Sequence, residues 1–419
     1  MRIGFIDARL GSTDGVSLEA AKWVTVLERM GHDIYYIVGE YSNPPENTTI
    51  IPEMGFFTDE NTWIQYHAFS PTQEKNELYD RINNLSNLIE EKITDAIEKF
   101  SIDLIILENC ITIPMQIPLG LAIKNLLHKN PIPAIAHHHD FYWERERFLN
   151  NNVQDILDIA FPVQESCISH TCINSIQKRA LKDKFNIDAI VVPNVFDFNS
   201  NVNRVDDFNK DFREIIGLSK NNIIFLQPSR IVPRKTIEYS IELVRQLHDD
   251  NIHFVLAGYS GDEGEEYLRK LEKLILEARI SAHFIHEHIF SERKTCPNKI
   301  YTLWDSYVHC DLVTFPSDFE GFGNHVVEAF YFKKPLFTNN YSVYSADIAP
   351  TGVDTILMNQ VVTSEVVEKT RIIMNDVKYR QEMVDKNFEI GQKYFSFETL
   401  QSLLESVLHK HPLILTVKD

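Results

Sequence analysis

The chain has 419 residues, of which 44% are hydrophobic and 24% charged, and its formal net charge is -19. This length predicts two domains of about 200 residues each, because a single hydrophobic core rarely grows so large. The acidic balance argues against nonspecific binding of nucleic acid, which requires a basic surface. It leaves room for a local basic pocket that binds a small anion.

The first ten residues, MRIGFIDARL, have the pattern of a short apolar strand rather than of a secretion signal. No apolar run reaches the roughly 18 residues needed to cross a bilayer, so we expect no stable membrane insertion. The five cysteines are odd in number and lack Cys-x-x-Cys spacing, which disfavours both a disulfide framework and a thiolate zinc site. Together these features predict a cytoplasmic protein.

Strand-like runs alternate with helical patterns along the whole chain. Residues 2–7 predict a strand, 17–31 an amphipathic helix that ends near Gly31, and 32–39 a second strand. Further expected strands lie in 102–108, 132–138, 167–170, 188–194, 222–229, 252–258, 282–289, 311–317 and 334–340. Short β-rich runs separated by helices predict an α/β fold with two doubly wound parallel sheets.

A polar, aperiodic stretch at 199–212 marks the expected boundary between the two domains. We therefore expect residues 1–200 to form a Rossmann-like first domain, completed by the C-terminal helix at 396–419. Residues 201–395 are expected to form the second. Because ligands of open α/β sheets bind beyond the carboxyl ends of the strands, the candidate site residues should follow the strand-like runs.

The first candidate site follows the strand at 222–229. Arg230 and Lys235 flank a turn that leads into an amphipathic helix. A guanidinium and an ammonium beside a helix N-terminus favour an anion site, because the free N–H groups and the helix dipole add to the two charges. A solvated basic turn is the equally weighted alternative.

The second candidate site is the segment SDFEGFGNHVVEAF at 317–330. Gly321 and Gly323 would let the backbone approach a ligand closely. A carboxylate can accept hydrogen bonds from two vicinal hydroxyls, which suits Glu320 and Glu328 to a sugar and a ribose. Glu328 lies among apolar neighbours, so its charge requires a partner.

The first half of the chain offers two further candidates. The loop GSTDG at 11–15 joins the first strand and helix but lacks the Gly-x-Gly-x-x-Gly pattern, so a dinucleotide fingerprint is not supported. The run AHHHD at 136–140 could be read as a metal site. We expect no metal there, because consecutive residues leaving a strand point in alternating directions and no partner cluster is evident.

These motifs together resemble the retaining glycosyltransferases of family 4, which have the GT-B fold of two facing Rossmann-like domains with a cleft between them. The resemblance rests on Arg230 and Lys235, on Glu320 followed by Glu328, on the first loop and helix, on HHHD, on VVPNVFD at 191–197 and on the last helix. It extends over nearly the whole chain. Each motif alone is weak, and the joint match is specific.

The resemblance implies roles for the donor-site residues. Arg230 and Lys235 would hold the donor diphosphate, Glu328 the ribose, and Glu320 with the backbone of Gly321, Phe322 and Gly323 the transferred sugar. His139, with His138 as the alternative, would contact that sugar, and Gly15 a phosphate. The base would pack near Ile285 and His288, although this segment departs from the family's usual glycine-bearing pattern.

The resemblance also implies a reaction and its substrates. The reaction would be transfer of a hexose with retention of configuration, without a cofactor, with His139, Arg230, Lys235 and Glu320 as the catalytic groups. GDP-mannose and UDP-glucose are the favoured donors. The expected acceptor is a small anionic sugar such as glucosylglycerate, held by Asp14, Tyr142, Trp143, Arg145 and Arg147, because arginine binds carboxylates and phosphates in a bidentate manner.

Within the family, the segments at 9–24 and 137–148 look most like the branch that makes mannosylglucosylglycerate or its phosphorylated form. A cell-envelope glycan or lipid acceptor, a catalytically silent sugar-nucleotide-binding protein, and a GT-B epimerase or phosphorylase remain alternatives. A solvated amphipathic helix is the alternative for 141–148. The sequence does not define the oligomeric state.

Overall fold

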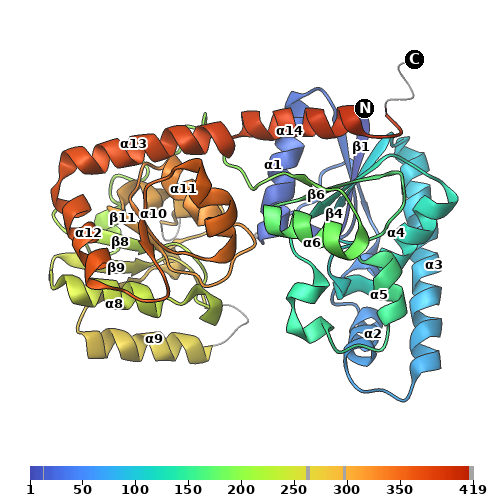
Figure 1. Cartoon of the computed structure of the whole chain (residues 1–419), viewed down its shortest axis with the longest axis horizontal. Helices are drawn as coiled ribbons and strands as arrows, with labels where there is room; N and C mark the ends of the chain where they lie inside the picture. The colour runs from blue at the N-terminus through green and yellow to red at the C-terminus, as the bar shows by residue number, and fades with distance from the viewer. Residues whose placement is uncertain (13, 261–264, 296–298, 415–419) are drawn as a thin grey trace. The chain divides into compact units, whose positions relative to one another are not determined.

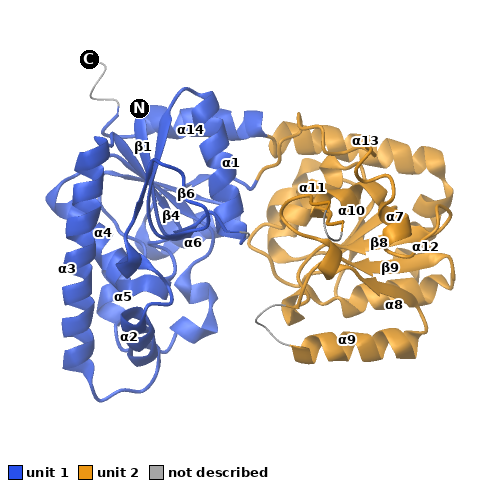
Figure 2. Cartoon of the chain, turned by 180° about the vertical axis from the view of Figure 1, so that it is seen from behind, with its two compact units in different colours: residues 1–194, 397–419 blue, residues 195–396 orange. Residues whose placement is uncertain are grey.

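The computed structural model describes residues 1–12, 14–260, 265–295 and 299–414. The chain divides into two compact units, coloured separately in Figure 2. Unit 1 contains Met1–Asn194 together with the chain from Phe397 onward, and unit 2 contains Val195–Ser396. The last helix therefore belongs to the same unit as the first strand.

Unit 1 is built on a parallel sheet with the strand order β3-β2-β1-β4-β5-β6-β7. Its strands are β1 (Arg2–Leu10), β2 (Asp33–Tyr41), β3 (Thr48–Ile50), β4 (Leu104–Glu108), β5 (Ala134–His138), β6 (Ile168–Cys172) and β7 (Ile190–Val191). The chain moves outward from β1 to β3 and then returns to the other side of β1 with β4. The strand order therefore reverses between β1 and β4, where ligands of such sheets bind.

Helices cover both faces of this sheet, with α3 and α4 on one face and α1 and α14 on the other (Figure 1). They are α1 (Gly15–Arg29), α2 (Asp59–Phe69), α3 (Lys75–Phe100), α4 (Ile117–Lys129), α5 (Gln154–Ala160), α6 (Ser175–Phe185) and α14 (Phe397–Lys410). The Arg29 guanidinium of α1 lies 5.1 Å from the ring centroid of Phe397, where α14 begins.

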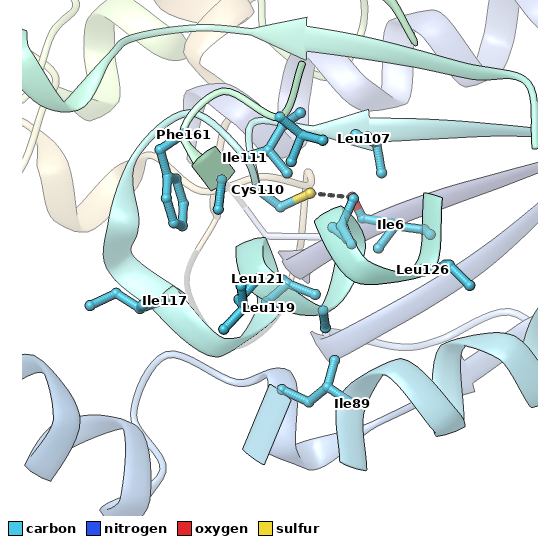
Figure 3. Close-up of a cluster of buried hydrophobic side chains, with 14 of the residues drawn as sticks. Ile6, Ile89, Leu107, Cys110, Ile111, Ile117, Leu119, Leu121, Leu126 and Phe161 are labelled. Atoms are coloured by element: carbon cyan, nitrogen blue, oxygen red, sulfur yellow. Dashed lines mark hydrogen bonds between the residues drawn. The ribbon is translucent and has the colours of Figure 1, made fainter. Parts of the chain in front are cut away.

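The core of unit 1 forms because α3 carries apolar residues at helical spacing. Leu78, Ile82, Leu85, Ile89 and Ile93 are all buried, while the opposite face of the helix is charged. They join the apolar side chains of α4 and the strands in one cluster, part of which is drawn in Figure 3. The cluster holds the carboxyl ends of β1 and β4 in fixed positions.

Unit 2 repeats this design with the strand order β10-β9-β8-β11-β12-β13, again parallel throughout. Its strands are β8 (Ile223–Gln227), β9 (Ile252–Leu256), β10 (Ser281–Phe284), β11 (Leu312–Phe315), β12 (Leu336–Asn339) and β13 (Ile356–Met358). Its point of reversed strand order lies between β8 and β11.

The helices of unit 2 are α7 (Phe212–Ile215), α8 (Glu238–Leu247), α9 (Glu265–Ala278), α10 (Leu303–His309), α11 (Asn324–Tyr331), α12 (Ser364–Asn375) and α13 (Val377–Tyr394). In Figure 1, α8 and α9 lie on one side of the sheet, and α11 and α13 on the other. Within the described residues, no helix is long and apolar enough to span a membrane.

The expectation of two doubly wound parallel sheets is thus confirmed. Two short strands, β3 and β13, were missed because three residues are too few to establish a period, even though all three positions of β13 are apolar. Residues 141–148 form neither a strand nor one amphipathic helix. They form two single 3-10 turns, Tyr142–Glu144 and Glu146–Phe148.

Candidate active site

The candidate site of unit 2 is formed by the loops that follow β8 and β11, the two strands at its point of reversed order. Two hydrogen bonds join these loops. The Thr236 hydroxyl donates to the Pro316 carbonyl at 2.6 Å, and the Asp318 N–H donates to the Arg234 carbonyl at 3.2 Å. Because the loops are tied together, residues some 85 positions apart in the sequence share one site.

Lys235 and Glu320 form an ion pair at this junction. Both are buried, and the Lys235 ammonium donates to Glu320 Oε1 while lying 4.7 Å from the ring centroid of Phe315. The Arg234 guanidinium contacts both Glu320 oxygens at 3.2 Å. Arg234 was not among the residues predicted from the sequence, although it stands directly before Lys235 in the basic turn.

The charges at this junction set the pKa values of both partners. Burial lowers the pKa of Lys235, and the charge of Glu320 offsets this only in part. Burial acts to raise the pKa of Glu320, but the charges of Lys235 and Arg234 outweigh it and lower that pKa. Two cations on one carboxylate leave a positive excess, which suits the site to an anionic ligand.

Arg230 lies at the same strand end but does not contact Glu320. Its side chain is exposed, and its charge contributes to lowering the pKa of Lys235. Gly258, after β9, allows the close approach of the Arg230 turn, because a Cβ there would lie 2.0 Å from the Ser229 carbonyl oxygen. The structure thus brings Arg234, Lys235 and Glu320 together and leaves Arg230 at their edge.

The Gly-Phe-Gly segment presents backbone rather than side chains. Gly323 has a φ of +109° and begins α11, and a Cβ there would lie 2.2 Å from the Tyr341 hydroxyl. The Phe322 ring is buried against Phe395, and its carbonyl accepts from Tyr341 at 2.7 Å. Gly321 is partly exposed. Only a glycine fits at 323, where the chain turns into α11.

Glu328 is buried on α11 and has the polar partners that its apolar surroundings require. Its Oε2 accepts from the Tyr307 hydroxyl at 2.7 Å and lies 2.6 Å from His325 Nδ1. Neither partner was named in the sequence analysis. His325 stands three residues earlier on the same helix, a spacing that places both side chains on one face.

The segment expected to bind the base lies in and after β10. The Ile285 side chain is buried. His288 is partly buried, and its backbone carbonyl accepts from the Tyr301 N–H at 2.8 Å. The Ile285 N–H donates to the Leu256 carbonyl at 2.9 Å, and the accessible rings between Ile285 and His288 are those of exposed His286 and partly buried His288.

In unit 1, the three consecutive histidines at the end of β5 have different surroundings. His138 is enclosed, with Nδ1 2.8 Å from the Thr112 hydroxyl and Nε2 2.9 Å from His170 Nδ1. His139 lies beyond the strand, with Nε2 2.7 Å from Glu108 Oε1. Both ring nitrogens of His138 are thus engaged within the protein, so His139 is the better placed of the two to contact a ligand.

Glu108, the last residue of β4, is the partner that the sequence analysis missed. Its Oε2 also lies 3.1 Å from His137 Nδ1, and the ligand atoms of Glu108, His137 and His139 all lie within 4.8 Å of one another. The premise that the histidine run has no partner cluster was therefore wrong. The partner was hidden because it ends an apolar run on the neighbouring strand.

The pKa values of the neighbouring carboxyl groups of Glu108 and Asp7 are shifted in opposite directions. Burial raises the pKa of Glu108, but the charge of His137 and hydrogen bonds from both rings outweigh this and bring it to about 2. Burial and the Glu108 charge raise the pKa of neighbouring Asp7 well above its usual range. Glu108 is therefore the ionised carboxylate of the pair, and both imidazoles satisfy it by hydrogen bonding.

In the first loop of unit 1, the candidate Asp14 is engaged in hydrogen bonds, whereas the candidate Gly15 is exposed. Asp14 caps α1, its Oδ1 accepting from the backbone N–H groups of Val16 and Ser17, each at 3.0 Å. Burial would raise the pKa of Asp14, but hydrogen bonds from Ser12 and Ser17 and the charge of Arg9 lower it. Gly15 is exposed at the start of α1, with open space where a Cβ would point.

Of the expected acceptor residues, the aromatic ones are less available than the arginines. Tyr142 is buried, and the Trp143 ring is stacked on Phe141 at a centroid distance of 4.4 Å. Arg145 is exposed and paired with Asp140. The exposed Arg147 guanidinium lies 4.5 Å from the ring centroid of Phe148.

Each unit contains a Rossmann-like parallel sheet, and its candidate residues lie where the strand order reverses. Two such domains are the architecture of the GT-B fold, and solved glycosyltransferase structures have the same fold. The chain matches Anabaena HepE in complex with UDP and glucose with a TM-score of 0.67 and 16% identity, over 98% of this chain and all of that one. It matches sucrose-phosphate synthase from Thermosynechococcus elongatus with a TM-score of 0.69 and 14% identity, over the full length of both. These likenesses concern the fold alone.

The sequence comparisons identify the family. Residues 208–389 match the model of glycosyl transferases group 1. A mannosylglucosylglycerate synthase of Thermotoga maritima is 32% identical over 96% of this chain and 99% of its own length. One of Petrotoga mobilis is 33% identical over 85% of this chain and 86% of its own. The chain belongs to the group 1 glycosyl transferases and is a hexosyltransferase.

Proposed function

We propose that this enzyme transfers a hexose from a nucleotide diphosphate sugar to a hydroxyl of a small anionic sugar acceptor of the glucosylglycerate type. The observation that carries the proposal is the similarity, over most of the chain, to two mannosylglucosylglycerate synthases. That name describes a product built from mannose, glucose and glycerate. Among donors it favours GDP-mannose over UDP-glucose.

The unit 2 site supports the donor half of this proposal. A nucleotide diphosphate carries negative charge, and the positive excess around Glu320 would attract it. Lys235 and Arg230 would stabilise the diphosphate as it leaves, since charge that develops in the transition state gains most from groups already fixed in place. Glu320 would accept from hydroxyls of the hexose, and Glu328 from those of the ribose.

We further propose that the hexose keeps its anomeric configuration and that no cofactor takes part. The leaving diphosphate oxygen would accept the proton of the acceptor hydroxyl on the same face from which that hydroxyl attacks. Retention by two displacements would need a carboxylate nucleophile close to the reacting carbon. Glu320, which has Lys235 and Arg234 as partners, is a poor nucleophile for that step.

A panel of substrates tests the proposal. GDP-mannose and UDP-glucose would each be offered with glucosylglycerate, its phosphorylated form, and glucosylglycerol, a matched neutral acceptor in which a hydroxymethyl group replaces the carboxylate. We expect turnover with the anionic acceptors at a much higher kcat/KM than with glucosylglycerol. Equal use of the neutral acceptor would overturn the assignment of the acceptor, and no turnover with any donor would overturn the whole proposal.

The product and a chelator test the mechanism. We expect NMR of the new glycosidic bond to show the donor's configuration, and EDTA to leave the rate nearly unchanged. An inverted product would refute the front-face reaction. Complete loss of activity in EDTA that Mg²⁺ or Mn²⁺ restores would refute the cofactor-free reaction.

A further inference from the structure

In the cluster of Glu108, His137 and His139, one carboxylate is hydrogen-bonded to two imidazole rings. Glu108 Oε1 lies 2.7 Å from His139 Nε2 and 3.0 Å from His137 Nδ1, and Oε2 lies 3.1 Å from His137 Nδ1. An ionised carboxylate only accepts hydrogen bonds. Both rings must therefore donate, His137 through Nδ1–H and His139 through Nε2–H.

This requirement fixes the tautomer of His139. With the proton on Nε2 directed to Glu108, Nδ1 of the neutral ring carries the lone pair and can accept a hydrogen bond. The Nε2 proton remains in place whether or not the ring is charged, so Nδ1 is the atom whose protonation changes. A His139 ring with no carboxylate partner would distribute its proton between the two nitrogens.

The rest of the loop holds the ring in one place. The His139 N–H donates to Asn109 Oδ1 at 3.0 Å, and its carbonyl accepts from Gln177 at 2.9 Å. Asn109 follows Glu108 with a φ of +54°, a left-handed conformation that asparagine adopts more readily than most residues other than glycine. The Trp23 ring stacks on His137 at a centroid distance of 4.1 Å.

We propose that Glu108 is a positioning residue: its carboxylate holds Nε2–H of His139 and thereby presents Nδ1 of the neutral ring as the acceptor for a hydroxyl of a sugar substrate. This inference rests on the proposed function, because it takes the ligand of His139 to be a sugar of that reaction. Groups that orient a ligand-binding histidine through its second nitrogen are a general device in protein sites. Here the hydrogen bond between Glu108 and His139 joins the ends of β4 and β5.

The first test is the tautomer, which can be measured without any substrate. In histidine-¹⁵N-labelled full-length protein, the protonated and bare ring nitrogens give separate signals, and loss of signals in His139→Asn assigns the ring. We expect His139 to be protonated at Nε2 at a pH where the ring is neutral. Protonation at Nδ1 instead overturns the proposal, as does a stoichiometric bound metal ion in the purified protein, since a metal would occupy the same lone pairs.

The second test is kinetic and uses two variants that differ in one acceptor. Glu108→Met removes both carboxylate oxygens, whereas Glu108→Gln keeps one carbonyl oxygen that can still accept from His139. We expect Glu108→Met to lower kcat roughly 10- to 100-fold with donor KM changed less, and Glu108→Gln to recover part of this loss. Glu144→Gln is the matched control, because Glu144 lies on the same loop and accepts from the Phe141 N–H but has no imidazole partner.

Wild-type kcat in folded Glu108→Met would overturn the positioning role. If Glu108→Met does not fold, the tautomer of the wild-type protein still decides the question. Failure of the proposed substrates would leave the tautomer result intact, so the two hypotheses fail separately.

Discussion

The two candidate sites lie at equivalent points of two similar sheets, yet they are held in place by different forces. In unit 2, the loops after β8 and β11 meet through permanent charges, with Arg234 and Lys235 on Glu320. In unit 1, the ends of β4 and β5 meet through imidazole rings, of which His138 bonds only to uncharged partners. In the proposed reaction, the site in unit 2 would therefore attract a charged ligand over a distance, and the site in unit 1 would orient hydroxyls at short range.

The first prediction tests the charged site by removing a charged side chain from unit 2. We expect Lys235→Ala and Glu328→Ala each to lower turnover by at least ~100-fold, because each loses one or two charged hydrogen bonds of roughly 1.5–3 kcal/mol. The melting temperature of Lys235→Ala should change little, since Glu320 keeps Arg234 as a partner.

Lys299→Ala is the matched control. It also removes a lysine from an ion pair in unit 2, but its partner is Asp211 and it lies outside the loops after β8 and β11. Its steady-state turnover should stay near that of the wild type. Activity close to wild type in purified Lys235→Ala would instead remove Lys235 from the site.

The sequence predicted more of the fold than of the site, for reasons visible in these residues. Apart from β3 and β13, the strands of both sheets are apolar runs bounded by helices, so the sequence pattern predicts them. Arg234 and Glu108 were missed because their roles depend on partners about 86 and 31 positions away, and no local pattern reports such a pairing. Asp14, which was expected to contact a ligand, is also the N-cap of α1, a local role that the sequence analysis did not assign to it, and its ligand contact stays a prediction.

The second prediction concerns the pH dependence of the stability of unit 1, where His170 is buried. Burial lowers the pKa of His170 from 6.5 to about 4 in the folded protein. Above pH 6.5, His170 is neutral in both states and contributes no pH dependence. As the pH falls from 6.5 toward 4, the unfolded chain binds a proton that the folded chain does not, so the folded state loses stability, by about 2 kcal/mol at pH 5.

We expect the free energy of unfolding of unit 1 to fall between pH 7 and pH 5, and His170→Gln to lose about 2 kcal/mol less. Urea titrations followed by tryptophan fluorescence report mainly on unit 1, which contains Trp23, Trp63 and Trp143, whereas unit 2 has only Trp304. His409→Gln, at an exposed position of α14, should retain the full pH dependence. An equal loss in wild type and His170→Gln would show that neutral buried histidines do not set the acid sensitivity.

The smallest expected effect concerns the arginines of the histidine loop, which would give unit 1 a positively charged contact for the acceptor. Arg145 is paired with Asp140, whereas the Arg147 guanidinium lies over the Phe148 ring. Partial burial and the charge of Arg145 lower the pKa of Arg147. An anionic acceptor would relieve that repulsion, so Arg147 has more to gain from binding than Arg145.

We therefore expect Arg147→Ala to raise the KM of the anionic acceptor about 10-fold, the cost of one charged contact of roughly 1.5 kcal/mol, while donor KM stays the same. Arg145→Ala should have a smaller effect, because its guanidinium must leave Asp140 before it can bind the acceptor. Initial rates with the acceptor varied at saturating donor measure both variants. If neither arginine changes the acceptor KM, the anionic acceptor is recognised elsewhere and unit 1 has no charged counterpart to the loops of unit 2.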